Sequence, residues 1–148
     1  MLDHNTARIY NFGEGGAMTL TGFAVVHSRS DGVEHTVDAP LIHCFDGKHV
    51  VLAYVLRTAL EDYFSLSARP SMDDSNLLVD RNLEAFSRIV ATKYERGERS
   101  VYDAFGQSFP RIDVTLDDMQ SSGEEFTAEV LKVKAMSEAM IHKLRIDA

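Results

Sequence analysis

The spacing of apolar residues changes near residue 53, and this change limits the folds open to the chain. Before it, segments 18–26 and 41–52 carry β-branched and aromatic residues in partial alternation, as half-buried strands do. After it, apolar residues recur at the spacing of one helix face: Val55, Leu56, Ala59, Leu60, Tyr63 and Phe64. A sheet followed by helices that cover it predicts an α+β fold.

Two Asp-Gly dipeptides between apolar runs predict where the sheet turns. Asp31-Gly32 and Asp46-Gly47 suit type I′ hairpin turns, because both central residues of such a turn take a positive φ. We therefore expect an antiparallel sheet of about four to six strands, with two to three helices packed on one face. The strands flanking the two turns are 18–26, 33–37, 41–45 and 49–52, and further short strands are expected at 8–12 and 111–116.

A second helix is expected over residues 72–96, after the break at Pro70. Asp73 and Asp74 suit the positive end of a helix, and Gly97 suits its termination. Segment 100–110 contains Gly106 and Pro110 and is expected to be a loop or one short strand.

The last part of the chain predicts an amphipathic helix that needs a partner surface. Residues 122–125 read Ser-Gly-Glu-Glu, which resembles a capping box that opens a helix. Steps of four and three residues then separate the members of an apolar stripe: Phe126, Val130, Val133, Ser137, Met140 and Leu144. We expect this stripe to dock on the sheet of the same chain, with self-association as a homodimer as the alternative. Another protein partner would use the same residues.

Length and charge bound the classes of function. The 148 residues, 45% of them hydrophobic, predict one domain over 1–148, with a core at 18–119 and the C-terminal helix at 120–148. The chain has fifteen Lys and Arg and twenty-three Asp and Glu, which give a formal net charge of −8. An acidic chain lacks the basic surface that attracts nucleic acid or an anionic membrane. We expect neither partner.

Cysteine use and the N-terminus indicate a compartment. Cys44 is the only cysteine, so the chain can form no internal disulfide. The first residues do not resemble a secretion signal, and no stretch has the length and apolar character of a membrane span. We expect a soluble cytoplasmic protein.

Several short motifs together resemble a known family. They are Asp46-Gly47-Lys48-His49-Val50 leading into Ala59 and Leu60, Ala85-Phe86 with Ile89-Val90, and the strand pattern over 114–118. Their order is similar to that in short bacterial proteins of the domain of unknown function 1488 family, over roughly residues 18–119. The chain lacks the cysteine that many members carry just before the first helix. The resemblance implies a bacterial α+β protein, but the family has no established activity and so implies no site residues.

Cys44 and His49 form the one candidate catalytic pair. A two-residue turn at Asp46-Gly47 would place them opposite each other on neighbouring strands. An imidazole next to a thiol can activate it as a nucleophile. The alternative is that Cys44 is a small core residue and His49 a surface residue near the turn.

Other polar clusters carry weaker signals. His27, His35 and His43 fall on consecutive expected strands, but a two-residue turn at Asp31-Gly32 sends His27 and His35 to opposite faces. We expect solvated histidines, no metal and no cofactor. The acidic pairs Asp73-Asp74, Asp117-Asp118 and Glu124-Glu125 could do acid–base work or hold a cation, and helix capping is the simpler reading for two of them.

No motif specifies a reaction. The sequence favours a small, non-enzymatic domain that binds a protein or a small ligand. The alternative is an enzyme with a cryptic site built on Cys44 and His49.

Overall fold

A computed structural model describes residues 20–27 and 37–147. The described part holds five strands and five helices, and confirms the α+β class. The strands are β1 Thr21–Val25, β2 Leu41–Phe45, β3 Val50–Val55, β4 Ser100–Ala104 and β5 Gln107–Val114. The helices are α1 Arg57–Tyr63, α2 Met72–Arg81, α3 Leu83–Glu95, α4 Leu116–Ser121 and α5 Glu129–Asp147. The expected strand at 8–12, and nearly all of the one at 33–37, lie outside the described residues.

The strands form one sheet in the order β1-β2-β3-β5-β4. Three of its four pairings are antiparallel, and β3 pairs with β5 in parallel. The sheet is therefore mixed rather than wholly antiparallel as expected. Parallel strands need a long crossover connection, and α1, α2, α3 and β4 supply it here.

β3 is the centre of the sheet. Every residue from Val51 to Val55 is buried, so this strand is covered on both faces. Its near-continuous apolar sequence, VVLAYV, is typical of such a strand. β2 instead alternates beyond Ile42: His43 and Phe45 are exposed, and Cys44 faces the core.

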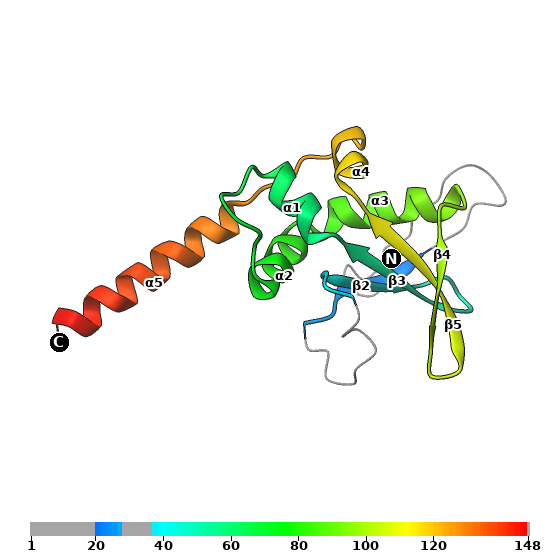
Figure 1. The fold of residues 1–148 in the computed structure, drawn as a ribbon, viewed down its shortest axis with the longest axis horizontal. Helices are drawn as coiled ribbons and strands as arrows, with labels where there is room; N and C mark the ends of the chain where they lie inside the picture. Colours follow the sequence, from blue (N-terminus) through cyan, green and yellow to red (C-terminus); the bar gives the residue numbers. More distant parts are fainter. Residues whose placement is uncertain (1–19, 28–36, 148) are drawn as a thin grey trace, which may run out of the picture.

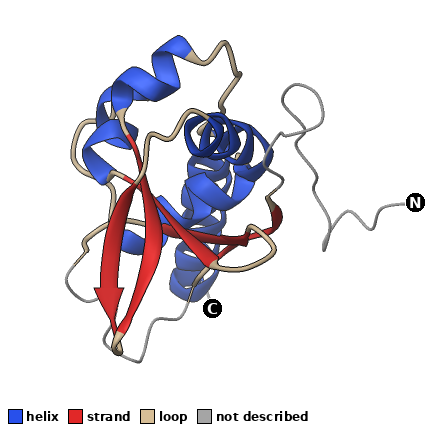
Figure 2. Ribbon diagram, turned by 90° about the vertical axis from the view of Figure 1, so that its right-hand side faces the viewer, coloured by secondary structure: helices blue, strands red, loops and turns tan. Residues whose placement is uncertain are grey.

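Helices α2 and α3 cover one face of the sheet (Figures 1 and 2). The main core lies between them and the strands, and contains Ile42, Ala53 and Ile112 from the sheet. Phe86 and Val90 of α3 are fully buried against them. Ala39, Leu41, Leu52 and Tyr54 form a smaller cluster of their own.

The expected helix over 72–96 is divided at Asn82. Ser71 caps α2 by accepting a hydrogen bond from the Asp74 N–H, and Gly97, at φ +76°, follows α3 as predicted. The Asn82 side chain donates to the carbonyl oxygens of Leu78 and Thr127 and accepts from the Thr127 N–H. It therefore fixes the joint between α2 and α3 to the segment that leads into α5.

Three expectations about the second half of the chain were wrong. Segment 100–110 contains β4, the turn at Phe105-Gly106 and the start of β5, rather than a loop or one short strand. The capping box lies at Thr115 and Asp118, where it opens α4. The terminal helix accordingly begins at Glu129, not at 122–125, so the helix expected over 120–148 spans 129–147.

Phe86 and Phe105 make a matched pair for testing the core. Phe86 is fully buried and its ring centroid lies 4.9 Å from that of Phe126, whereas Phe105 is 73% exposed at a hairpin tip. We expect Phe86→Ala to lower the free energy of unfolding by about 3–5 kcal/mol. Phe105→Ala should change it by less than about 0.5 kcal/mol. Urea unfolding followed by circular dichroism measures both, and equal losses would contradict the core described here.

Candidate functional site

The predicted pair of Cys44 and His49 is not formed as expected. The turn between β2 and β3 has four residues, 46–49, so Cys44 pairs with Val51 and Phe45 with Val50. The expected register, which set Cys44 opposite His49, was wrong. Hydrogen bonds from the backbone to the Asp46 carboxylate close this wider turn.

Cys44 lies in the main core and is 2% exposed. Its Sγ lies 3.9 Å from the Val51 carbonyl oxygen, to which the thiol donates. Burial, together with the negative charge of Asp46, raises the pKa of the thiol to about 12. The thiolate is the nucleophilic form of cysteine, so this environment opposes an activated nucleophile.

Asp46 organises the turn and ties it to α3. Its carboxylate accepts hydrogen bonds from the N–H groups of Lys48 and His49 at 2.8 and 2.6 Å. The Tyr94 hydroxyl, from the last turn of α3, donates to the same carboxylate at 2.5 Å. His49 Nδ1 lies 3.4 Å from Asp46 Oδ2. The side chain of Asp46 is only 5% exposed.

These contacts shift the pKa values of both partners. Burial favours the neutral form of Asp46, but the hydrogen bonds from Tyr94, His49 and Lys48 together outweigh it and lower its pKa to about 2. Burial and the hydrogen bond to Asp46 raise the pKa of Tyr94 to about 12. At neutral pH the carboxylate is ionised and the phenol is neutral, and the hydrogen bond between them is charge-assisted.

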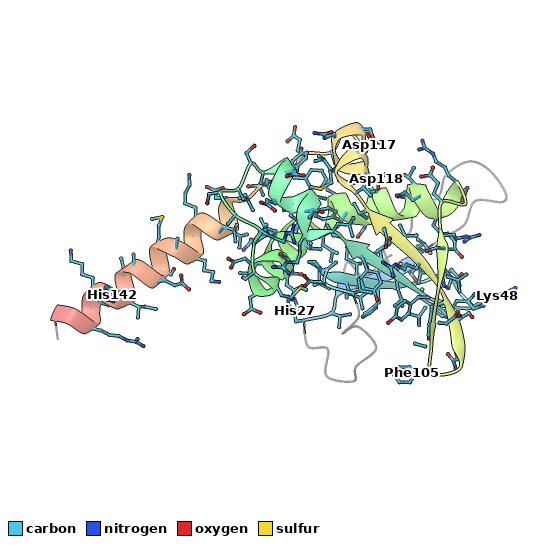
Figure 3. All side chains as sticks on the ribbon, viewed as in Figure 1. His27, Lys48, Phe105, Asp117, Asp118 and His142 are labelled. Atoms are coloured by element: carbon cyan, nitrogen blue, oxygen red, sulfur yellow. The ribbon has the colours of Figure 1, made fainter. Side chains whose placement is uncertain are left out.

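A groove opens beside this turn, and we call it the turn groove. One part, of about 590 Å³, is lined by residues 46–49, Tyr94, Arg99 and Pro110. A second part, of about 470 Å³, shares His49, Arg99 and Pro110 with the first and extends along β4 and β5. Figure 3 shows Lys48 reaching outward here, at the opposite end of the molecule from His142 on α5.

A smaller cavity of about 280 Å³ lies between α3 and α4, and its charges are paired within the protein. Lys93 Nζ lies 2.6 Å from Asp118 Oδ2 and donates to the Asp113 carbonyl. Arg88 makes two hydrogen bonds to Glu124. These partners leave little unsatisfied charge in this cavity for a ligand.

The other predicted clusters do not form a site among the described residues. Asp73-Asp74 and Asp117-Asp118 lie in the first turns of α2 and α4, as helix capping explains, whereas Glu124-Glu125 precedes α5. His35 lies outside the described residues. Within residues 20–27 and 37–147, no three His, Cys, Asp or Glu side chains are grouped so that they could hold a metal ion.

The apolar stripe of the terminal helix does not dock on the sheet, so that expectation was wrong. Only the beginning of the segment packs on the core: Phe126, which precedes the helix, lies against Tyr63 and Phe86, and Val130 is partly buried. From there α5 projects away from the body (Figure 1). Its large apolar side chains are 50–66% exposed: Val133, Met136, Met140, Ile141 and Leu144.

The contact of Asp46 with Tyr94 was not predicted from the sequence, and neither was the placing of Lys48 and Arg99 in one groove. Asp-Gly marked the turn, but nothing in the sequence connects a turn residue to a tyrosine 48 positions later. Met136 and Ile141 also widen the exposed stripe beyond the predicted positions.

Comparison of the chain with protein-family models, with curated proteins and with solved structures found no match. No helix in the described part of the chain combines the length and apolar character needed to cross a bilayer.

The hydrogen bonds of Asp46 predict a pH-dependent contribution to stability. Because its pKa is lowered from 3.8 to about 2, the ionised carboxylate stabilises the fold above the higher value, and this contribution is lost as pH falls through the lower one. We expect Asp46→Asn to lower the free energy of unfolding by about 1–2 kcal/mol at pH 7. The difference from wild type should shrink between about pH 4 and pH 2.

Glu125→Gln is the matched control, because Glu125 is exposed and makes no ion pair with any described residue. Its effect should stay within about 0.5 kcal/mol at either pH. A loss in Asp46→Asn that is the same at both ends of the pH range would contradict the assigned role of the charge.

Cys44 provides a separate test of the enzyme alternative. With a buried thiol of raised pKa, alkylation by iodoacetamide should be very slow in the native protein between pH 7 and 9, and fast in guanidinium chloride. Mass spectrometry of timed samples measures the modified fraction. Rapid native alkylation, with an apparent pKa below the free value of about 8.5, would restore Cys44 as a candidate nucleophile.

Proposed function

We propose that this chain is a non-enzymatic protein-interaction domain that self-associates through α5. The observation that carries the proposal is the exposed stripe of five large apolar side chains on a helix that projects from the body. Burial of such side chains is the main favourable term in protein association. A contiguous apolar surface of this kind marks an interaction site.

The spacing of the stripe suits a helical partner. Val130, Val133, Ser137, Met140 and Leu144 follow alternating steps of three and four residues, which is the a/d pattern of helices that pack side by side. Met136 and Ile141 lie along the edges of that seam. A second α5 carries the same pattern and therefore forms a self-complementary surface around a two-fold axis.

Charge favours an antiparallel pair. With the two-fold axis near residue 136, Glu129 of one copy faces Lys143 of the other, and the same attraction recurs at the opposite end. Neither Glu129 nor Lys143 has an ion-pair partner among the described residues. A parallel pair would instead need Lys134, whose Nζ already lies 2.6 Å from Asp74 of its own chain.

The position of the body at the start of α5 also favours an antiparallel pair. α5 starts against α2, and Asn82 together with Phe126 fixes the segment before it. A parallel pair would bring two such bodies together at one end, whereas an antiparallel pair separates them.

The enzyme alternative has less support, because its named nucleophile is buried in the core with a raised pKa. The resemblance to the domain of unknown function 1488 family stays a proposal and covers 18–119, so it does not bear on α5. We propose the bacterial cytoplasm, where Cys44 would stay reduced, as the setting.

The proposal predicts a concentration-dependent dimer that a single charge in the seam disrupts. Met140→Glu places a carboxylate in the seam of both copies, and should weaken association at least about tenfold. Ala135→Glu is the matched control, because it adds the same charge to the same exposed helix about 140° around from Met140. Sedimentation equilibrium over a range of protein concentrations measures the dissociation constant.

The wild-type chain and Ala135→Glu should dimerise alike, and Met140→Glu should be mainly monomeric. A wild-type chain that stays monomeric at every concentration would overturn the proposal. So would equal weakening by the two substitutions. Urea unfolding of all three proteins, followed by circular dichroism, should show that the body remains folded.

A further inference from the structure

Two cations in the turn groove of this acidic protein have no carboxylate partner in the part of the chain that the structure describes. Many of the described Lys and Arg side chains are paired with acids: Arg57 with Asp38, Arg88 with Glu124, Lys93 with Asp118, Arg111 with Asp113 and Lys134 with Asp74. Lys48 and Arg99 have no such partner within the described residues, and both line the groove. We propose that the turn groove binds a small organic anion, in which a phosphate or carboxylate group is attached to a flat apolar body. This site goes beyond the proposed self-association and lies at the other end of the molecule.

Arg99 is held in place by an aromatic ring. Its guanidinium carbon lies 4.0 Å from the ring centroid of Tyr94. Tyr94 is itself buried, and its hydroxyl donates a hydrogen bond to Asp46. Stacking covers one face of a guanidinium. Arg99 also hydrogen-bonds the Tyr94 side chain, and its remaining N–H groups can donate to an anion. The hydrogen bond from Tyr94 to Asp46 holds the tyrosine ring in place, and the ring in turn orients Arg99.

Lys48 and His49, from the turn between β2 and β3, also line the groove. The Asp46 carboxylate accepts both of their backbone N–H groups and so fixes the turn that carries them. Both side chains are exposed. A small anion between this turn and Arg99 would gain charge-assisted hydrogen bonds from both Lys48 and Arg99.

Among the described residues that line the groove, Asp46 is the single acidic one, and its carboxylate is already hydrogen-bonded within the protein. Its two oxygens accept hydrogen bonds from Tyr94 and from the backbone of Lys48 and His49. The remaining lining residues that carry charge at neutral pH are cations. The described lining therefore holds two cations and one carboxylate, although the net charge of the whole chain is −8.

The second part of the groove favours an organic ligand over a bare ion. Val101, which is 65% exposed, pairs with Pro110 across the hairpin of β4 and β5, and the two offer an apolar wall next to the cations. The volumes of about 590 and 470 Å³ fall in the range of small-molecule sites. A long polyanion would be repelled by the net charge of the rest of the chain, so a small molecule fits better.

The test is a titration of the full-length, ¹⁵N-labelled chain followed by NMR. Phenyl phosphate and benzoate are the two test ligands, inorganic phosphate tests the head group alone, and phenol tests the body alone. We expect saturable shifts at the amides of Gly47, Lys48, Arg99 and Ser100. Either aromatic anion should bind more tightly than inorganic phosphate or phenol, and the tighter of the two identifies the preferred head group.

Arg99→Gln should weaken binding about tenfold, which is the loss of one charge-assisted hydrogen bond. Arg81→Gln is the control, because Arg81 is exposed at the end of α2, outside the groove, and its loss changes the net charge equally. If Arg99→Gln perturbs the fold, Lys48→Gln in the exposed turn provides the second variant. Shifts that do not saturate, that map elsewhere, or that weaken equally in Arg81→Gln would overturn the proposal.

Discussion

The parallel pairing of β3 with β5 is the constraint on which the rest of the structure depends. It places two strands side by side whose chain segments are separated by three helices and a hairpin strand. Because β3 then has neighbours on both edges and is covered on both faces, residues 51–55 are fully or almost fully removed from water. The crossover that this pairing requires also lays α2 and α3 across the sheet, and so creates the main core.

Both surfaces that we associate with function are placed by contacts at the ends of these helices. At the end of α3, Tyr94 reaches Asp46 in the turn between β2 and β3, and Arg99 stacks on the same tyrosine. At the joint of α2 and α3, Asn82 holds the backbone of Thr127 just before α5. This pair of helices thus positions the turn between β2 and β3 at one end of the molecule and the projecting helix at the other (Figure 1).

The two surfaces offer different chemistry. α5 presents apolar side chains with a charged residue at each end of the seam, which suits a second copy of the same helix. The turn groove presents cations next to a short apolar wall, which suits a small anion. Cys44 belongs to neither surface, because its thiol faces the core between them.

The sequence by itself determined the local elements. Several features follow from interactions between residues close in the chain. They are the Asp46-Gly47 turn with its two strands, the acidic first turn at Asp73 and Asp74, the stop at Gly97 and the apolar period of the helices. Such interactions are encoded in short patterns and can be read without a fold. The α+β class followed from the order of those patterns.

Only the tertiary structure decided how the elements meet. The width of the turn, and with it the partner of Cys44, depended on hydrogen bonds to Asp46 and on a tyrosine from a distant helix. The sequence of the stripe from Val130 to Leu144 is the same whether the helix docks on its own sheet or projects from the body. Its spacing indicates that it needs an apolar partner but does not identify that partner. Helices α2 and α3 occupy the face of the sheet on which α5 was expected to dock. Which helix covers that face depends on the packing of the whole chain, so a local pattern does not reveal it.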